Sequence, residues 1–277
     1  MTTAVVLAGG GLTGIAWEIG VLLGLRNKGF DIVRDADLII GTSAGSVVGT
    51  QLSQGLDLSD LFARQQQPDE NEISPRIDLE VMTQVYSQMR GGGTQSDEQR
   101  QQIGQIALNN SFVDWPTRRA VIEGRVKTDT WPDRNLIVTT IDAESGEFRT
   151  WSKNDGVGLI DAVASSCAVA GIWPCVPING RMYYDGGFRN SANASLAFGY
   201  DTVWVLAPLS GDASPAVETE VQHLREEGAD VQYITTDDTA KQAMGLNSLD
   251  PRVRGAAAEQ GLRQGHAFAE LLGRMKP

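Results

Sequence analysis

The start of the chain twice repeats a short apolar run, a glycine-rich segment and a helical pattern of apolar positions. Residues 3–8 (TAVVLA) run into three glycines, and residues 13–30 then carry apolar side chains at helical spacing. Residues 36–45 (ADLIIGTSAG) repeat the order, and a helix is expected from residue 46 to about residue 54. Two such units in succession predict a parallel sheet with helices on its faces.

The pattern changes at residues 57–131, which are rich in glutamine and charge and have helical spacing around LEVMTQVYSQM. We interpret this stretch as a helical insertion that caps the sheet. Strand patterns return at residues 135–152, where ESGE predicts a hairpin turn. Two further strands are expected in DTVWVLAPL and ADVQYITTD, and a terminal helix from about residue 251. The prediction is one α/β domain, residues 1–277, with a mostly parallel central sheet.

The charge and amino-acid composition of the chain argue against several classes of function. A formal charge of −12, from 35 acidic and 23 basic residues, argues against nucleic acid and anionic bilayers as partners, although a local apolar rim could still contact a membrane transiently. No run approaches the roughly 18 apolar residues of a membrane span, and the first residues do not resemble a signal peptide. Two cysteines and two histidines offer neither a disulfide framework nor metal-ligand spacing. A cytoplasmic protein without metal or cofactor is expected.

The second glycine-rich segment has the pattern of a nucleophile elbow. It reads G-x-S-x-G and consists of Gly41, Thr42, Ser43, Ala44 and Gly45. The chain must turn sharply between strand and helix, which leaves no room for side chains two residues on either side of the serine. A strand is predicted before this motif and a helix after it, so we interpret Ser43 as a nucleophile.

The first glycine-rich segment, GGGLTG, matches G-x-G-x-x-G and has two interpretations. A dinucleotide-binding loop requires an acidic residue about 20 positions further on. Asp31 lies at that distance, but it follows a helix and does not end the next strand. Alternatively, the loop amides point at the carbonyl oxygen that Ser43 attacks. We favour this second interpretation, because it explains both loops with one site. The residues concerned are Gly9, Gly10, Gly11, Leu12 and Gly14.

A nucleophilic serine needs a base. His223 lies in the charged segment EVQHLREE and His266 in the terminal helix, so both are interpreted as surface or packing residues, with a Ser-Asp-His triad kept as the alternative. Asp185 is the better candidate, because it ends an aromatic strand and precedes Gly186 and Gly187, which leave room beside its carboxylate.

Taken together, the glycine loop, G-x-S-x-G and the distant Asp-Gly-Gly resemble the patatin-like phospholipase family in order and spacing. The resemblance extends through DLIIGTSAGSVVG and AVASSCAVAGIWPCVPINGRMYYDGGFRN. It implies a three-layer α/β/α fold and a Ser-Asp dyad that hydrolyses esters of acylated lipids, with Ser43 as nucleophile and Asp185 as base.

Two positions depart from that family's pattern. Thr13 stands where the family usually has a basic residue, and Ala192 stands where an Asn-x-Pro turn would have proline. The second difference is expected to loosen the turn without removing a catalytic group. Two other functions use the same motifs: transfer of the acyl group from Ser43 to an acceptor other than water, and nucleotide binding by a regulatory protein through the first glycine loop.

Overall fold

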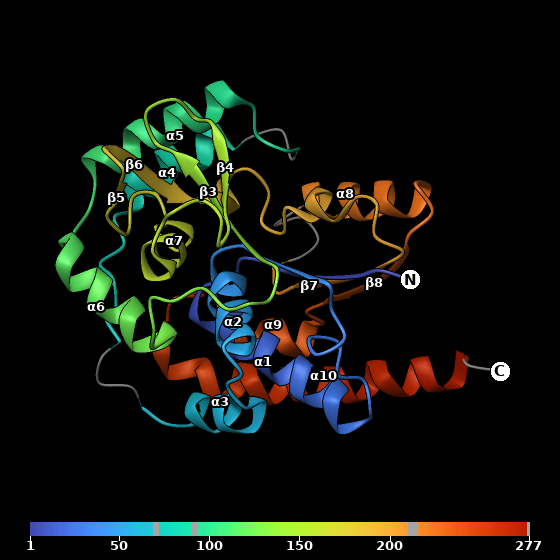
Figure 1. The fold of residues 1–277 in the computed structure, drawn as a ribbon. Coiled ribbons are helices and arrows are strands. Elements are labelled where there is room, and N and C mark those ends of the chain that lie inside the picture. Colours follow the sequence, from blue (N-terminus) through green and yellow to red (C-terminus); the bar gives the residue numbers. More distant parts are fainter. Residues whose placement is uncertain (69–71, 90–92, 210–214, 276–277) are drawn as a thin grey trace.

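The computed structural model describes residues 1–68, 72–89, 93–209 and 215–275. Its centre is an eight-stranded sheet in the order β5-β6-β3-β2-β1-β7-β8, with β4 paired to β3 (Figure 1). The strands are β1 (Thr3–Leu7), β2 (Leu38–Gly41), β3 (Leu136–Asp142), β4 (Phe148–Trp151), β5 (Val176–Ile178), β6 (Arg181–Asp185), β7 (Thr202–Ala207) and β8 (Asp230–Thr235).

The sheet is mostly parallel, as predicted. Strands β3, β2, β1, β7 and β8 run in one direction, while β4 and β6 are antiparallel to β3. The β3-β4 pair is the hairpin expected around ESGE. Carboxyl ends of neighbouring parallel strands lie at one edge of a sheet, so the loops after β1 and β2 are brought together there.

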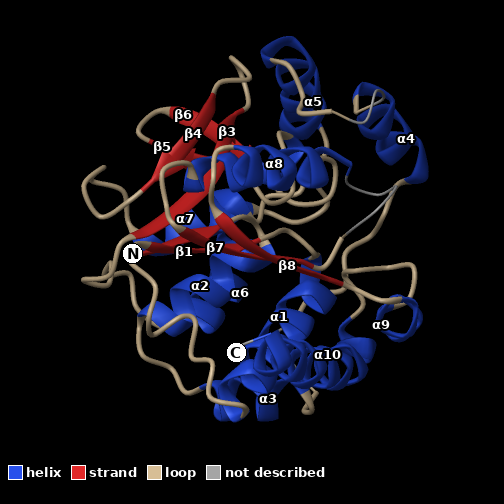
Figure 2. Ribbon diagram, turned by 90° about the vertical axis from the view of Figure 1, so that its right-hand side faces the viewer, coloured by secondary structure: helices blue, strands red, loops and turns tan. Residues whose placement is uncertain are grey.

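Helices cover both faces of the sheet and complete the three layers (Figures 1 and 2). They are α1 (Gly11–Asn27), α2 (Ala44–Ser53), α3 (Leu58–Gln65), α4 (Leu79–Gln88), α5 (Asp97–Asn109), α6 (Trp115–Val126), α7 (Leu159–Ser166), α8 (Pro215–Glu226), α9 (Asp238–Met244) and α10 (Arg254–Met275). Alternate residues of β1 divide between the layers. Val5 and Leu7 pack into the core with α1 and α2, whereas Ala4 and Val6 pack with α8.

Two helices begin earlier than the sequence pattern predicts. Helix α1 starts at Gly11, inside the first glycine-rich segment, and α2 starts at Ala44 instead of residue 46. Both loops are therefore shorter than expected. As a result, the first-turn amides of each helix lie directly at the end of the preceding strand, where the unpaired donors of a helix start are available to a ligand.

The described residues between 57 and 131 form four helices, which pack on different parts of the fold. Helix α3 packs against α1 and α10, α5 against β3 and β6, and α6 against α2 and α7. Helix α4 lies beside α5 (Figure 2). Residues 69–71 and 90–92 of this stretch lie outside the described part of the chain.

Helices α1 and α10 approach each other so closely that their contact needs glycine. A β-carbon on Gly20 would lie 2.1 Å from the backbone oxygen of Ala258, and one on Gly261 would lie 2.1 Å from the oxygen of Trp17. Gly24 and Gly265 face the partner helix's backbone in the same way. The terminal helix is thus fixed to the core by direct contact between backbones.

Gly20→Ala should therefore separate α1 from α10 and lower the free energy of unfolding by about 1–3 kcal/mol, the usual cost of overpacking. The measurement is urea unfolding followed by circular dichroism. Gly273→Ala is the matched control in α10, because a β-carbon there meets no atom within 4 Å. That change should be neutral or stabilising by up to about 1 kcal/mol. Equal stability of the two variants would contradict the close contact.

Candidate active site

Ser43 lies in a strained turn between β2 and α2. Its φ of 51° and ψ of −113° are unfavourable for a residue with a side chain. A β-carbon on Gly41 would lie 2.5 Å from the α-carbon of Ser46, and one on Gly45 would lie 2.0 Å from the oxygen of Leu7. Both flanking glycines are therefore required by the backbone path, as a nucleophile elbow demands.

The end of α7 holds the turn from the opposite side. The backbone N–H of Ser43 donates to Ser166 Oγ at 2.8 Å, and Cys167 Sγ donates to the Ser43 carbonyl at 3.3 Å. Burial raises the pKa of the Cys167 thiol to about 11, so the thiol keeps the proton that it donates. The sequence analysis missed both positions, because nothing in ASSC distinguishes them from the rest of a small-residue helix.

Strand register brings Asp185 to the level of Ser43. Gly41 pairs with Val138 on β3, and Thr140, two residues further along β3, pairs with Asp185 on β6. Ser43 and Asp185 line the same cavity, and the Ser43 hydroxyl acts to lower the pKa of the Asp185 carboxyl group. The Gly187 N–H donates to Asp185 Oδ1 at 2.8 Å. The structure therefore brings together the two residues that the sequence paired as nucleophile and base.

The Asp185 carboxyl group is almost completely buried, with 3% of its surface exposed. Burial raises its pKa to about 7, against the opposing effects of the Ser43 hydroxyl, the Gly187 amide and the positive charge of Arg118. A carboxylate with a pKa near neutrality can accept a proton during a reaction and return it afterwards. The environment thus suits Asp185 to general acid-base chemistry.

The glycine loop presents free amides beside Ser43. The N–H groups of Gly9, Thr13 and Gly14 donate to backbone oxygens of Ser191, Ser248 and Gly10, respectively. Those of Gly10, Gly11 and Leu12 have no hydrogen-bond acceptor among the described residues. These three amides are the ones that the sequence analysis assigned to a carbonyl oxygen under attack.

Ser43 lies where two cavities meet. The larger, about 760 Å³, also contains Asp185 and has a largely apolar wall. That wall includes Met82, Tyr86, Met89, Ile172, Phe188 and Met244. The smaller, about 20 Å³, lies between Ser43, Arg118 and Trp173. Trp173 and Ile172 come from the GIWPCVPI segment, whereas most apolar residues of α1 are core.

A match to one protein-family model shows the family to which the chain belongs. The model of the family described as patatin-like phospholipase matches residues 5–198, which include Ser43, Asp185 and both glycine loops. The chain belongs to the patatin-like phospholipase family. Membership supports a lipid hydrolase activity. No curated protein matches the chain in sequence.

Three solved structures show partial likeness to this patatin-like chain. VipD from Legionella pneumophila has 13% sequence identity and a TM-score of 0.48, over 98% of this chain and 67% of VipD. The type III effector ExoU has 13% identity and a TM-score of 0.43, over 98% and 53%. ExoU in complex with SpcU from Pseudomonas aeruginosa has 15% identity and a TM-score of 0.48, over 100% and 53%. The chain thus spans about half to two thirds of the length of these proteins.

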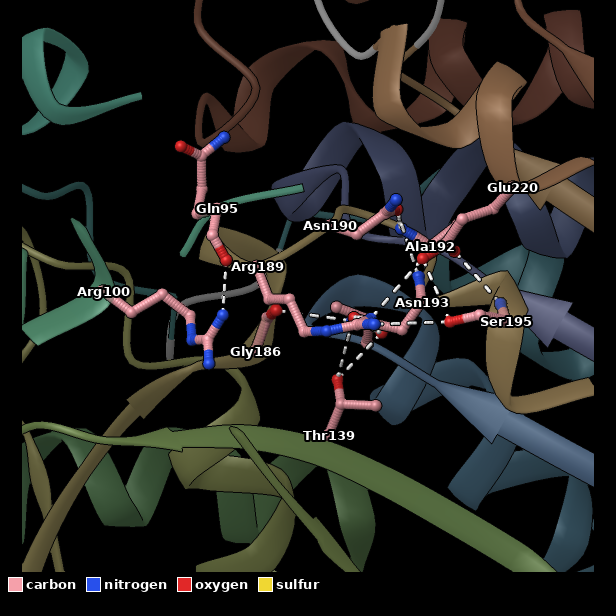
Figure 3. A network of polar contacts seen from close by, with 11 residues as sticks. Gln95, Arg100, Thr139, Gly186, Arg189, Asn190, Ala192, Asn193, Ser195 and Glu220 are labelled. Carbon is pink, nitrogen blue, oxygen red and sulfur yellow. Dashed lines mark hydrogen bonds and ion pairs between the residues drawn. The ribbon is translucent and has the colours of Figure 1, made fainter. Parts of the chain in front are cut away.

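Asn193 connects the loops that contain Ser43 and Asp185 in this patatin-like chain (Figure 3). Its Nδ2 donates to Thr42 Oγ1 at 3.1 Å and to the Gly186 carbonyl at 3.3 Å, and it lies 3.5 Å from Thr139 Oγ1. Arg189 in turn donates to Asn193 Oδ1 at 2.7 Å. One fully buried side chain therefore contacts the residue before Ser43 and the residue after Asp185.

The turn that precedes Asn193 is not loosened by Ala192. Asn190 Oδ1 accepts hydrogen bonds from the backbone N–H groups of Ala192 at 3.0 Å and of Asn193 at 3.2 Å. A proline at position 192 could not donate the first of these bonds. The expected loosening is therefore wrong, because the alanine N–H replaces the rigidity of a proline ring with a hydrogen bond.

Several candidates from the sequence lie away from the site. His223 packs on Phe198 and lies 3.7 Å from Glu227, and His266 contacts Asn27. Neither histidine lines either cavity beside Ser43. Asp31 lies beside Thr3 at the start of β1, the opposite end of that strand from the glycine loop, so it cannot serve a nucleotide bound there. Within the described ranges, no group of acidic, histidine or cysteine residues could hold a metal ion.

Replacing Asn193 should weaken the site's framework. Its φ of 51° favours asparagine or glycine, so Asn193→Gly removes only the side-chain bonds and should cost about 1–3 kcal/mol of unfolding free energy. Asn193→Ala adds backbone strain of about 1–2 kcal/mol. Chemical unfolding of both variants measures separately how much the lost side-chain hydrogen bonds and the backbone strain lower the free energy of unfolding.

The control for Asn193 is Asn179, which has the same φ of 51° but is exposed. Asn179→Gly should leave stability unchanged, while Asn179→Ala should show the strain cost alone. If Asn193→Gly were as stable as the wild type, the side-chain bonds would contribute nothing.

Proposed function

We propose that the protein is a serine lipid acyl hydrolase that uses a Ser43-Asp185 dyad. The observation that supports this most strongly is the buried Asp185 carboxylate, which lines the same cavity as Ser43 and lies near three unpaired amides. Membership of the patatin-like phospholipase family supports the lipid class of substrate.

The reaction has two halves that use the same groups. As Ser43 Oγ attacks the ester carbonyl carbon, Asp185 accepts the hydroxyl proton, and it then donates that proton to the alcohol oxygen as the C–O bond breaks. Asp185 next takes a proton from water, whose oxygen attacks the acyl-enzyme. The proton returns to Ser43 when the fatty acid leaves.

Each attack puts negative charge on the carbonyl oxygen. The amides of Gly10, Gly11 and Leu12 are the donors proposed to stabilise it, because they are unpaired and lie on the wall of the same cavities or beside it. Loss of one such donor typically costs about 2.7–4 kcal/mol of transition-state stabilisation. Their preorganisation at the start of α1 would supply a large part of the rate enhancement.

The larger cavity suits an acyl chain. Its volume of about 760 Å³ and its methionine-rich wall match the concave, mostly apolar sites that bind small molecules. Methionine side chains adapt their shape to flexible ligands. We therefore propose broad specificity toward the acyl chain of the lipid substrate.

The 57–131 segment would act as a cap through two of its helices. Helix α4 contributes Met82 and Tyr86 to the larger cavity, and α6 contributes Arg118 to the smaller. Helices α3 and α5 pack on the body of the fold. The proposal is thus one domain in which α4 and α6 select substrate while the sheet carries the chemistry.

The mouth of the larger cavity would contact the lipid surface. Leu246 and Tyr86 line this cavity, yet Leu246 is fully exposed and Tyr86 is 61% exposed. Among the described residues, no helix has the length and apolar character needed to cross a bilayer. Exposed apolar residues around a lipid-binding cavity allow substrate to pass from a membrane into the site without entering water.

The dyad is tested by variants and by pH. Ser43→Ala should abolish covalent labelling by a fluorophosphonate and esterase activity, and Asp185→Asn should reduce kcat at least about 100-fold. Since the pKa of Asp185 is raised to about 7, the basic form is lost as pH falls, and kcat/KM should decline below that pH.

Controls for the dyad are His223→Ala and His266→Ala, which should retain most activity. A histidine variant as inactive as Ser43→Ala would replace the dyad with a triad. Product analysis with an added alcohol or thiol distinguishes hydrolysis from transfer to another acceptor, because transfer would yield the new ester or thioester.

The contact with lipid is tested at Leu246. Leu246→Ser should lower hydrolysis of neutral phosphatidylcholine vesicles about tenfold, since burying a leucine contributes about 1.5–3 kcal/mol. Hydrolysis of a soluble short-chain ester should not change. Leu271→Ser on α10 is the control, because this exposed leucine lines neither cavity at Ser43. Equal losses on vesicles and soluble ester would refute the membrane contact.

A further inference from the structure

Arg118 is a buried cation beside Ser43. It projects from α6, and only 5% of its surface is exposed. Its guanidinium lies over the Trp173 ring at 3.9 Å from the ring centre, and both residues line the small cavity that contains Ser43. The stacking fixes the orientation of the guanidinium plane and leaves its edge free for hydrogen bonds.

This guanidinium has no hydrogen-bond partner among the described residues, and its Nη1 atom is completely buried. Burial, followed by the nearby charge of Arg125, lowers the pKa of Arg118 to about 9. Arg125, in contrast, is satisfied by two bonds to Glu72, at 2.9 and 2.6 Å. Buried arginines are normally paired, so Arg118 retains unused capacity to bind an anion.

The charged groups around the small cavity do not supply that anion. Glu72 is already engaged by Arg125. Asp185 influences Arg118 only through the electrostatic effect of its charge, and its carboxylate accepts a hydrogen bond from the Gly187 N–H. An oxyanion that enters next to Ser43 would therefore find one unneutralised guanidinium.

We propose that Arg118 binds the phosphate of a glycerophospholipid while Ser43 attacks its ester, so that the enzyme prefers phospholipids to neutral acylglycerols. This proposal rests on the hydrolase function proposed above. In such a lipid a short glycerol unit joins the ester to the phosphate, and both groups can reach adjoining cavities. Arginine is suited to this task because its planar fork matches phosphate oxygens.

The size of the small cavity limits which part of the head group enters. Its volume of about 20 Å³ is close to the space that one water molecule occupies, so it accepts a phosphate oxygen and not a whole head group. Gly11, Ser43 and Val169 line both cavities, and the remaining atoms of the lipid lie in the larger one. Head groups that differ beyond the phosphate should consequently be accepted alike.

The kinetic test compares phosphatidylcholine with diacylglycerol of the same chains, each in neutral detergent micelles. Neither lipid gives the micelle a net charge, so the electrostatic repulsion between the acidic protein and the micelle is the same for both lipids. Arg118→Gln should lose about 10- to 100-fold in kcat/KM on phosphatidylcholine, the range for a charged hydrogen bond, and change little on diacylglycerol. Arg118→Lys should be intermediate, because it keeps the charge without the fork.

Arg119→Gln is the matched control on α6, where Arg119 pairs with Asp161 at 2.9 Å and does not line either cavity. It should leave both activities unchanged. Equal losses on both lipids in Arg118→Gln, or no loss on either, would overturn the proposal. The melting temperature of Arg118→Gln should not fall, because the arginine bears an unpaired buried charge; a marked fall would assign it a structural role.

Binding can be measured without turnover. Ser43→Ala should bind dihexanoyl phosphatidylcholine more tightly than dihexanoylglycerol by calorimetry, and the added change Arg118→Gln should remove the difference. If the wild type hydrolyses no ester but this difference persists, the hydrolase proposal fails and the phosphate site stands. Inorganic phosphate that binds Arg118 without any preference for the phospholipid would refute a head-group site.

Discussion

The burial of the Asp185 carboxylate in the cavity that also contains Ser43 is the constraint on which the site depends. The two residues come from segments far apart in the chain, and each lies at the end of a strand of the same sheet. A carboxylate out of water has a raised pKa and a strong demand for donors, and the Gly187 amide supplies one. The burial of Asp185 therefore accounts both for its fixed position near Ser43 and for the raised pKa of its carboxyl group.

Keeping Ser43 and Asp185 in place requires contacts from several segments. The backbone at Ser43 has unfavourable dihedral angles, which persist only because surrounding contacts determine the path. Ser166 binds the Ser43 amide, and Asn193 binds the neighbours of Ser43 and Asp185, Thr42 and Gly186. Behind them, the close contact of α1 with α10 fixes the helix that starts at the glycine loop. Hydrogen bonds from distant segments thus offset the backbone strain at Ser43.

The inserted helices give the site its surroundings. Helix α4 contributes apolar wall, and α6 contributes Arg118, whose buried Nη1 atom has no hydrogen-bond partner among the described residues. Residues from the ends of the strands and from the insertion therefore line the same cavities. Residues that bind substrate often lower the stability of the free protein, and the buried, unpaired Arg118 fits that pattern.

The sequence by itself predicted the mostly parallel sheet and the sharp G-x-S-x-G turn, because strand periodicity and the glycines beside a sharp turn are local constraints. The catalytic pairing of Ser43 with Asp185 stays a prediction. The sequence pattern predicted later starts for α1 and α2. Gly11 and Ala44 belong to these helices because contacts in the folded protein stabilise them there. Ser166, Asn193 and Arg118 could not be identified at all. Their roles follow from strand register and from the packing of α6 and α7, and such contacts between distant segments leave no periodic trace in the chain.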